Sequence, residues 1–267
     1  MTVAGTGTTS SWDVAAVADT LLEAERTATA RASIAKEWDG LDVATAYEVQ
    51  DLALRRRHER GERTVGVKLG LTSKAKQAQM KVDEPSVAWL TDAMELEGGR
   101  RVPVGDLIHP RVEPEIVFVL DRPLTGPGVT AASALASVGA VMAGLEIIDS
   151  RFAGYGFTLP DAIADNNSSG LFATGSVACA PQGLDLALEG CLLEVDGAVV
   201  DSATGAAVLG HPAEALAFAA NQLGRRGHTL EPGWIVLTGG MTNALPVEPG
   251  ARVAAHFTHL GSVVLSG

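Results

Sequence analysis

The sequence predicts an α+β fold, with a small helical lobe at the N-terminus followed by a β-rich core built on a mixed sheet. Two amphipathic helical patterns occupy the first part of the chain. After residue 62, short apolar runs separated by Gly, Pro and Asp dominate, and they do not alternate regularly with helices. This disfavours a Rossmann or barrel layout. We therefore expect a tail and helical lobe over residues 1–62 and the core over residues 63–267.

Two helices are expected in the N-terminal lobe. Apolar residues recur every three or four positions over residues 11–29, with charged residues on the other faces, as in an amphipathic helix. A second helix is expected over about Val43–Arg60. Thr45 and Glu48 have the spacing of a capping box, and Gly61 is suited to end the helix. The basic end of this helix complements the helix dipole and indicates a solvated helix end.

Short β-like runs make up most of the remaining chain. Asp196-Gly197 lies between two apolar runs and predicts a tight hairpin. Helical patterns interrupt the strands at about Ala131–Val138 and Pro212–Leu223. The expected strands are Val65–Leu69, Arg111–Leu120, Val141–Ile148, Leu171–Thr174, Gly190–Val195, Ala198–Ser202, Trp234–Thr238, Val253–Phe257 and Ser262–Leu265.

The composition excludes several classes of partner. The formal net charge of −12 disfavours nucleic acid and anionic membrane surfaces, because both need a basic face. No apolar run reaches the length of about 18 residues that a membrane span requires. The two cysteines, Cys179 and Cys191, cannot form a disulfide framework. They are typical of a protein in a reducing cytoplasm.

The segment around Glu113 and Glu115 is the most informative one. Side chains two residues apart on a strand share a face, where two carboxylates repel unless a cation or a proton lies between them. Pro114 between them cannot donate a ladder hydrogen bond, which predicts an edge strand or a bulge. Glu146 lies within another apolar run, where an unpaired carboxylate is costly. Three such ligands suit Mg²⁺ or Mn²⁺. Alternatively, the first two carboxylates are solvated and Glu146 pairs with Arg151.

Three further segments each have two interpretations. Lys68 lies within an apolar strand, so it either extends its charged end to solvent or faces anions in a site. The polar stretch 161–170 is either a capped turn or a source of donors for a ligand carboxylate. Residues 238–242 form either a surface turn or a tight loop that faces a ligand. The residues alone leave each pair of alternatives open.

Six short segments of the sequence, taken together, resemble the motifs of a known protein family. They are GVKLGLTS (66–73), HPRVEPEI (109–116), LEIIDSR (145–151), ADNNSS (164–169), GHPA (210–213) and TGGMTNA (238–244). With them the chain resembles the fumarylacetoacetate hydrolase superfamily, in its hydratase and decarboxylase branch. The resemblance runs from about Leu41 to the C-terminus. Ser86-Val87-Ala88-Trp89 departs from it, since both kinds of relative usually have an aromatic-Gly pair there, which puts one pocket wall and the substrate in question.

The resemblance implies a fold and a site. The core would be the mixed β-roll of that family, and Glu113, Glu115 and Glu146 would hold Mg²⁺ or Mn²⁺. Lys68 would lie in the active site as a catalytic residue, and Asp165 would orient a water or a ligand as a second one. The expected contacts to a substrate carboxylate come from a larger set: Thr72, Ser73, Arg151, Ser168 and Ser169.

The resemblance also implies an activity. The expected reaction is the decarboxylation of 2-oxo-3-hexenedioate to 2-hydroxypenta-2,4-dienoate, in the meta-cleavage degradation of aromatic compounds. The alternatives are hydration of 2-hydroxypenta-2,4-dienoate and, in another class, a non-catalytic scaffold subunit for a partner enzyme. Members of the family are oligomeric, so we expect a homo-oligomer that takes a 2-oxo dicarboxylate substrate and associates with a companion hydratase.

Overall fold

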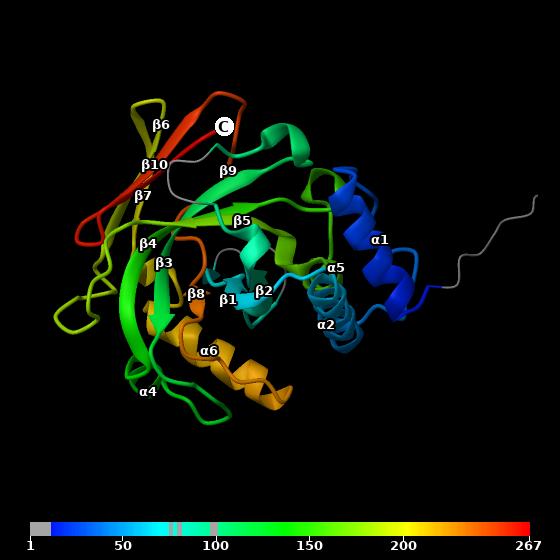
Figure 1. Ribbon diagram of the computed structural model, residues 1–267, viewed down its shortest axis with the longest axis horizontal. Coiled ribbons are helices and arrows are strands. Elements are labelled where there is room, and N and C mark those ends of the chain that lie inside the picture. The colour runs from blue at the N-terminus through cyan, green and yellow to red at the C-terminus, as the bar shows by residue number, and fades with distance from the viewer. Residues whose placement is uncertain (1–11, 75–76, 79–81, 97–100) are drawn as a thin grey trace, which may run out of the picture.

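The computed structural model describes residues 12–74, 77–78, 82–96 and 101–267 (Figure 1). The tail expected at the N-terminus lies outside these residues. The helices are α1 (Val14–Arg26), α2 (Val43–Glu59), α4 (Ala131–Leu135), α5 (Leu159–Ala164) and α6 (Pro212–Arg225). The strands are β1 (Thr64–Gly70), β2 (Ser86–Thr91), β3 (Arg111–Leu120), β4 (Val138–Ile148), β5 (Ser169–Thr174), β6 (Gly190–Val195), β7 (Ala198–Thr204), β8 (Ile235–Leu237), β9 (Leu245–Pro246), β10 (Arg252–Phe257) and β11 (Ser262–Ser266).

The strands form two sheets. The larger has the order β2-β1-β8-β3-β4-β5, with β9 also paired to β3, and the smaller has the order β11-β10-β6-β7. β1 and β8 run parallel, whereas the other neighbours run antiparallel. The larger sheet is therefore mixed, and the predicted α+β class with a β-rich mixed-sheet core is confirmed.

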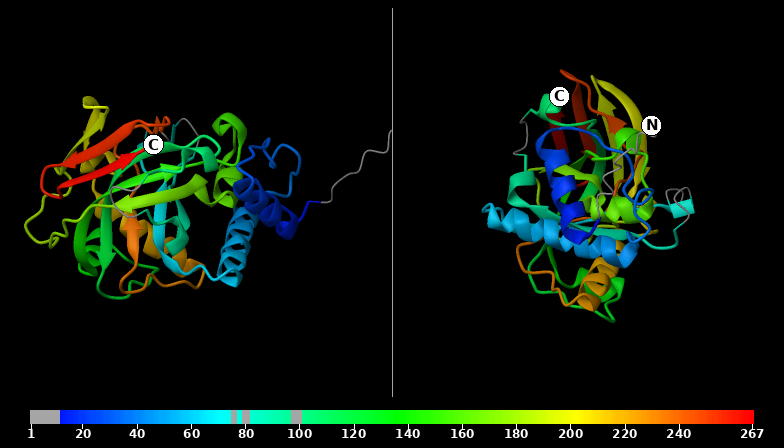
Figure 2. Two further views of the ribbon diagram at one scale, coloured as in Figure 1. Left: turned by 45° about the horizontal axis from the view of Figure 1, so that its top comes forward. Right: turned by 90° about the vertical axis from the view of Figure 1, so that its right-hand side faces the viewer.

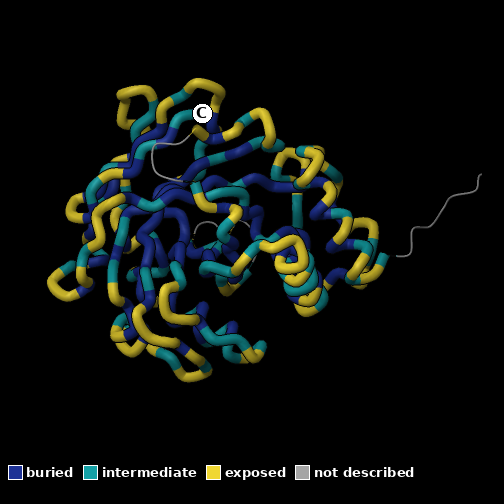
Figure 3. Tube along the Cα trace, viewed as in Figure 1, coloured by how far each residue is buried: buried dark blue, intermediate teal, exposed yellow. Residues whose placement is uncertain are grey.

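The largest apolar cluster among the described residues joins both sheets to α6. The long antiparallel pair of β3 and β4 runs through its centre, where Ile116, Phe118 and Ile147 have no exposed surface. Buried residues follow these central strands, and the exposed residues gather on the loops around them (Figure 3). The small sheet lies at one end of the molecule, and α1 and α2 lie at the other (Figure 2). The middle of β3 and β4 is therefore the part of the fold best shielded from water.

The N-terminal helices share a second apolar cluster with the core. Residues of α1 and α2 pack against Phe152 and Ile163, which belong to the segment that follows β4. Asp161 on α5 accepts hydrogen bonds from Ser33 Oγ at 2.6 Å and from the Ala35 amide at 2.9 Å. The predicted helical lobe therefore buries its apolar face against residues 152–164. The division of the chain after residue 62 stays a prediction.

Local signals place several boundaries as predicted. Asp196 and Gly197 both have positive φ, at 50° and 85°, and they join β6 to β7, which is the geometry of a tight two-residue hairpin. Gly61, with φ +97°, follows the end of α2. The predicted capping box of Thr45 and Glu48 is wrong, because Asp42 caps α2 by accepting a hydrogen bond from the Thr45 amide at 2.8 Å. The helix expected over residues 131–138 ends at Leu135, since β4 begins three residues later.

The expectation that Pro114 marks an edge strand is wrong. β3 lies inside the sheet, between β4 on one side and β8 and β9 on the other. Pro114 falls between the stretches of β3 that pair with β8 and β9. There its carbonyl accepts from the Met241 amide at 2.9 Å. The missing N–H thus costs no ladder bond, because a loop takes the place of a strand at this point.

Two of the elements that are absent from the expected set contribute residues to the site cavity described below. β2 is a run of six residues that are all buried, and α5 has only six residues. Both are too short for a clear periodic signal. Among the residues that the structure describes, no helix is both long and apolar enough to span a membrane.

Candidate metal centre and active site

Three carboxylates from the two central strands converge on one point. Glu113 and Glu115 lie two residues apart on β3, and Glu146 lies directly opposite Glu113 on β4. One carboxylate oxygen from each residue lies within 4.8 Å of the others. Their exposed fractions are 6%, 0% and 1%. The structure thus brings together the three predicted ligands and rules out a solvated strand face. We call them the acidic cluster.

The acidic cluster is electrostatically unfavourable on its own. Burial, followed by the negative charges of Glu146 and Glu113, raises the pKa of Glu115 well above its usual value. The Gly239 amide offsets part of this by donating to Glu115 Oε2 at 2.7 Å. Burial also raises the pKa of Glu146, and the positive charge of Lys68 opposes that rise. Within the described residues, Glu115 Oε1 and Glu146 Oε2 lack a hydrogen-bond donor, and Glu146 Oε1 faces only the Lys68 ammonium group, at 3.1 Å. A hard cation would satisfy these oxygens.

Lys68 faces the acidic cluster from β1. Its Nζ pairs with Glu146 Oε1 at 3.1 Å and donates to the Asn167 carbonyl at 2.6 Å. Only 3% of the side chain is exposed. Lys68 therefore does not extend its charge to solvent, and its ammonium group is held inside the site. The proposed ion pair between Glu146 and Arg151 is wrong, because Arg151 pairs with Asp165.

Residues 238–242 form a tight loop against the acidic cluster rather than a surface turn. Gly239 has φ +110°, and a Cβ there would lie 2.1 Å from Thr72 Oγ1. A Cβ on Gly240 would lie 2.1 Å from Glu113 Oε2. Gly239 is needed for its positive φ and its close approach to Thr72, and Gly240 because the loop backbone packs directly on the Glu113 carboxylate.

Lys68 and Glu113 line one cavity of about 430 Å³, which we call the site cavity. Of the hydroxyl residues expected to contact substrate, Ser168 lines it. Thr72 is buried against Gly239, and Ser169 Oγ donates to the Asn166 carbonyl at 2.8 Å. Ser73 lies in the segment that follows β1, where its carbonyl accepts from the Gln77 amide. The cavity wall also contains residues that were not among the expected substrate contacts: Ser86, Arg111, Tyr155, Asn167 and Asn243.

A left-handed run of three residues supplies part of the cavity wall. Asn166, Asn167 and Ser168 have φ values of 49°, 50° and 57°, which non-glycine residues rarely adopt. The Asn167 side chain accepts from Ser86 Oγ at 3.0 Å, and its Nδ2 is buried without a partner in the described structure. This run therefore presents both the carbonyl that receives Lys68 and an unused amide donor.

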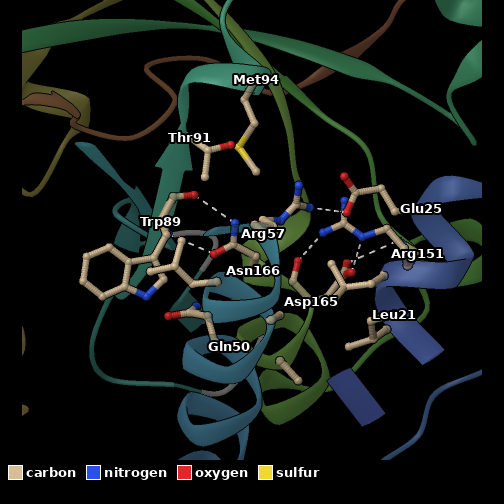
Figure 4. Close-up of a pocket in the computed structure, with 14 residues that line it drawn as sticks. Leu21, Glu25, Gln50, Arg57, Trp89, Thr91, Met94, Arg151, Asp165 and Asn166 are labelled. Carbon is tan, nitrogen blue, oxygen red and sulfur yellow. Dashed lines mark hydrogen bonds and ion pairs between the residues drawn. The ribbon is translucent and has the colours of Figure 1, made fainter. Parts of the chain in front are cut away.

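Arg151 holds the two ends of this run. Its guanidinium donates to the Asp165 carboxylate and carbonyl on one side, and to the Ser169 carbonyl, at 2.9 Å, on the other. It also donates to the Asp149 carbonyl at 2.7 Å. Figure 4 shows Arg151 and Asp165 facing each other beside Glu25. Because these bonds engage the guanidinium within the protein, the structure places Arg151 in a support of the run rather than in the site cavity.

Asp165 belongs to the same support. It lines a separate small cavity of about 20 Å³ with Arg151, Glu25 and Arg57, which is enough space for one water molecule. Burial raises the pKa of Asp165 to about 6, against the opposing effect of the Arg151 guanidinium. The carboxylate also accepts from Ser168 Oγ at 3.2 Å. Asp165 is therefore one step removed from the site cavity, which it reaches through Ser168.

Comparison with known proteins shows which family has this architecture. Residues 63–265 match the family described as fumarylacetoacetate (FAA) hydrolase C-terminal. The chain belongs to the fumarylacetoacetate hydrolase family. It is 41% identical to 4-oxalocrotonate decarboxylase of Pseudomonas sp. (strain CF600), over 86% of this chain and 87% of that one. It is 39% identical to 2-hydroxyhexa-2,4-dienoate hydratase of Comamonas testosteroni, over 87% and 89%.

A solved structure of the family matches the whole arrangement. It is 4-oxalocrotonate decarboxylase from Pseudomonas putida G7, complexed with magnesium and adipate. The match has a TM-score of 0.92 at 38% identity and covers 95% of this chain and 96% of that one. The predicted family is thereby confirmed, and so is the predicted fold.

A double-mutant cycle tests the support formed by Arg151 and Asp165. Arg151→Met leaves the buried Asp165 without its ion-pair partner, which should lower the free energy of unfolding by about 3–5 kcal/mol. Combining it with Asp165→Asn should cost less than the two single changes added together, with a coupling energy of about 1–3 kcal/mol. Urea unfolding measures all four proteins.

The exposed pair Arg26 and Glu23 provides the control for this cycle. Both side chains are more than half exposed, so solvent screens their charges and their coupling energy should be far smaller than that of Arg151 and Asp165. Equal coupling energies for the two pairs would contradict the assigned role of Arg151.

Proposed function

We propose that the chain is a divalent-metal-dependent decarboxylase that converts 2-oxo-3-hexenedioate to 2-hydroxypenta-2,4-dienoate and CO₂ in the meta-cleavage degradation of aromatic compounds. The observation that carries the proposal is the acidic cluster, which borders, through Glu113 and beside Lys68, one cavity large enough for a small dicarboxylate. Support comes from the relatives named 4-oxalocrotonate decarboxylase and from the magnesium and adipate held by the matching structure.

Glu113, Glu115 and Glu146 would hold Mg²⁺ or Mn²⁺. Their ligand atoms are all oxygens, and the buried oxygens without donors fit a hard cation. When bound, the ion supplies Lewis acidity toward the 2-oxo acid end of the substrate.

Lys68 would act on the oxygen where negative charge develops. The C5–C6 bond breaks and CO₂ leaves. The electron pair moves through the conjugated chain to the 2-oxygen, which then gains a proton. The Lys68 ammonium group is fixed beside Glu146 and inside the cavity, so it can stabilise that charge or deliver the proton. We therefore assign Lys68 as the catalytic residue.

The remaining site residues would orient the substrate or support those that do. Ser168 and the unpaired Nδ2 of Asn167 border the site cavity and can donate to substrate oxygens. Ser73 remains a candidate contact beside the cavity. Thr72 and Ser169 would act through packing and a backbone hydrogen bond. We assign Asp165 and Arg151 as positioning residues, because they fix the left-handed run without lining the cavity.

Hydration of 2-hydroxypenta-2,4-dienoate is the second candidate activity. It is favoured by relatives of similar identity and coverage that are named hydratases. Both activities would use the same acidic cluster and Lys68. Assays of the two substrates side by side therefore separate them.

The protein with Mg²⁺ should release CO₂ from 2-oxo-3-hexenedioate. Lys68→Met should lower kcat by about 10²–10⁴-fold, because the side chain keeps its length but loses its charge and proton. Lys36→Met, at an exposed position, is the control and should leave kcat unchanged. Hydration of 2-hydroxypenta-2,4-dienoate without CO₂ release would overturn the decarboxylase in favour of the hydratase.

We further propose that the chain forms a homo-oligomer and associates with a companion hydratase that consumes its product. The edge strand β7 exposes Val199 and Val200, with 58% and 49% of their surface accessible, and such an edge favours strand pairing with a second copy.

Light scattering should give a multiple of the 27.5 kDa chain mass, and Val199→Lys should lower the measured mass. A monomer at every concentration would contradict the proposal, and separate elution of the mixed enzymes would contradict the association.

A further inference from the structure

Arg111 shares a strand face with the acidic cluster. It is the first residue of β3 and lies two positions before Glu113, so their side chains leave the sheet on the same side. Two residues of a strand span about 6.6–6.8 Å. Both side chains line the site cavity. The wall of the site cavity thus contains a carboxylate of the acidic cluster and a permanently charged arginine from two positions earlier on the same strand.

The charge of Arg111 is not used within the described part of the protein. Its Cζ lies 4.5 Å from the centroid of the Tyr155 ring, and no ion pair or side-chain hydrogen bond of Arg111 occurs among the described residues. Tyr155 is fixed by its hydroxyl, which lies 3.2 Å from the His109 carbonyl and 3.1 Å from the Ile148 carbonyl. An arginine supported on a ring in this way keeps its N–H groups available for a carboxylate. Arg151, in contrast, is fully engaged.

Part of the wall of the site cavity is apolar. Ile148, Phe157 and Ala162 line the same cavity. A carboxylate that enters this region loses water and therefore needs a charged partner. We propose that Arg111 binds the distal carboxylate of a dicarboxylate substrate and thereby makes the site selective for diacids over monoacids.

This inference rests on the proposed function, because it assigns the substrate class of the same site. In 2-oxo-3-hexenedioate, four bonds separate the ketone carbon from the distal carboxyl carbon, and the double bond keeps the two ends apart. That length is comparable to the strand step between Glu113 and Arg111. The oxo acid end can therefore lie at the acidic cluster while the distal carboxylate reaches Arg111.

The reaction fixes the kinetic role of Arg111. The distal carboxylate is the group that leaves as CO₂, so its negative charge moves away from Arg111 in the transition state. Arg111 thus binds the ground state more strongly than the transition state. Its removal should raise KM and leave kcat equal or higher. A loss of folding would instead lower the active fraction and kcat with it.

Calorimetric titration with two stable probes tests the inference. With Mg²⁺ present, the wild-type protein should bind 2-oxohexanedioate at least about tenfold more tightly than 2-oxohexanoate, which has the same chain without the second carboxylate. Arg111→Met should bring this ratio close to one by weakening only the diacid. Arg111→Lys should keep part of it, and Arg122→Met, whose side chain is 71% exposed in the wild type, should keep all of it.

Two results would overturn the role of Arg111. One is equal binding of the two probes by the wild-type protein, which needs no variant, and the other is an unchanged ratio in Arg111→Met. Either result together with CO₂ release would remove the inference and leave the proposed function in place. An Arg111-dependent preference for the diacid without CO₂ release would have the opposite meaning: the site takes diacids, and the proposed reaction is wrong.

Discussion

The repulsion among three carboxylates buried on β3 and β4 is the constraint on which the rest of the site depends. Desolvation and like charge both oppose ionisation of Glu115 and Glu146, and the protein supplies only partial compensation. Lys68 brings one positive charge, and the Gly239 amide brings one hydrogen bond. Glycines at 239 and 240 let the loop backbone approach this closely. The negative charge that remains uncompensated can be balanced by a divalent cation that binds oxygen ligands.

The left-handed run 166–168 links this cluster to the periphery of the fold. The run receives the Lys68 ammonium group at a carbonyl and borders the site cavity, so its unusual backbone conformation holds that ammonium group in the site. Arg151 and Asp165 hold its ends, and Asn166 joins it to β2 through two hydrogen bonds with Trp89. The N-terminal helices complete this support by burying Phe152 and Ile163. They therefore contribute to the site without lining its cavity.

Much of the fold and the acidic cluster could be predicted from the sequence because local rules govern them. The i, i+2 spacing of Glu113 and Glu115 places both side chains on the same face of any strand. The Asp196-Gly197 pair is by itself enough to predict the hairpin between β6 and β7. Tertiary contacts decided the rest. From the sequence, Arg151 was expected to contact the substrate. Its pairing with Asp165 instead depends on how the chain turns between the two residues, which the sequence pattern does not give. The two-residue spacing between Arg111 and Glu113 could have indicated that both side chains face the site. That the Arg111 guanidinium lies on the Tyr155 ring could not be predicted, because Tyr155 lies far along the chain.

Thermal unfolding of metal-free protein, with and without Mn²⁺, tests the central claim most directly. Saturating ion should stabilise the wild type by about 2.7 kcal/mol at a hundredfold excess over Kd. In Glu115→Gln the ion should have little effect, and this variant without metal should be at least as stable as the metal-free wild type, because it lacks one buried charge. Glu95→Gln, at an exposed position, should behave as the wild type. Equal stabilisation of Glu115→Gln and the wild type by Mn²⁺ would contradict the account.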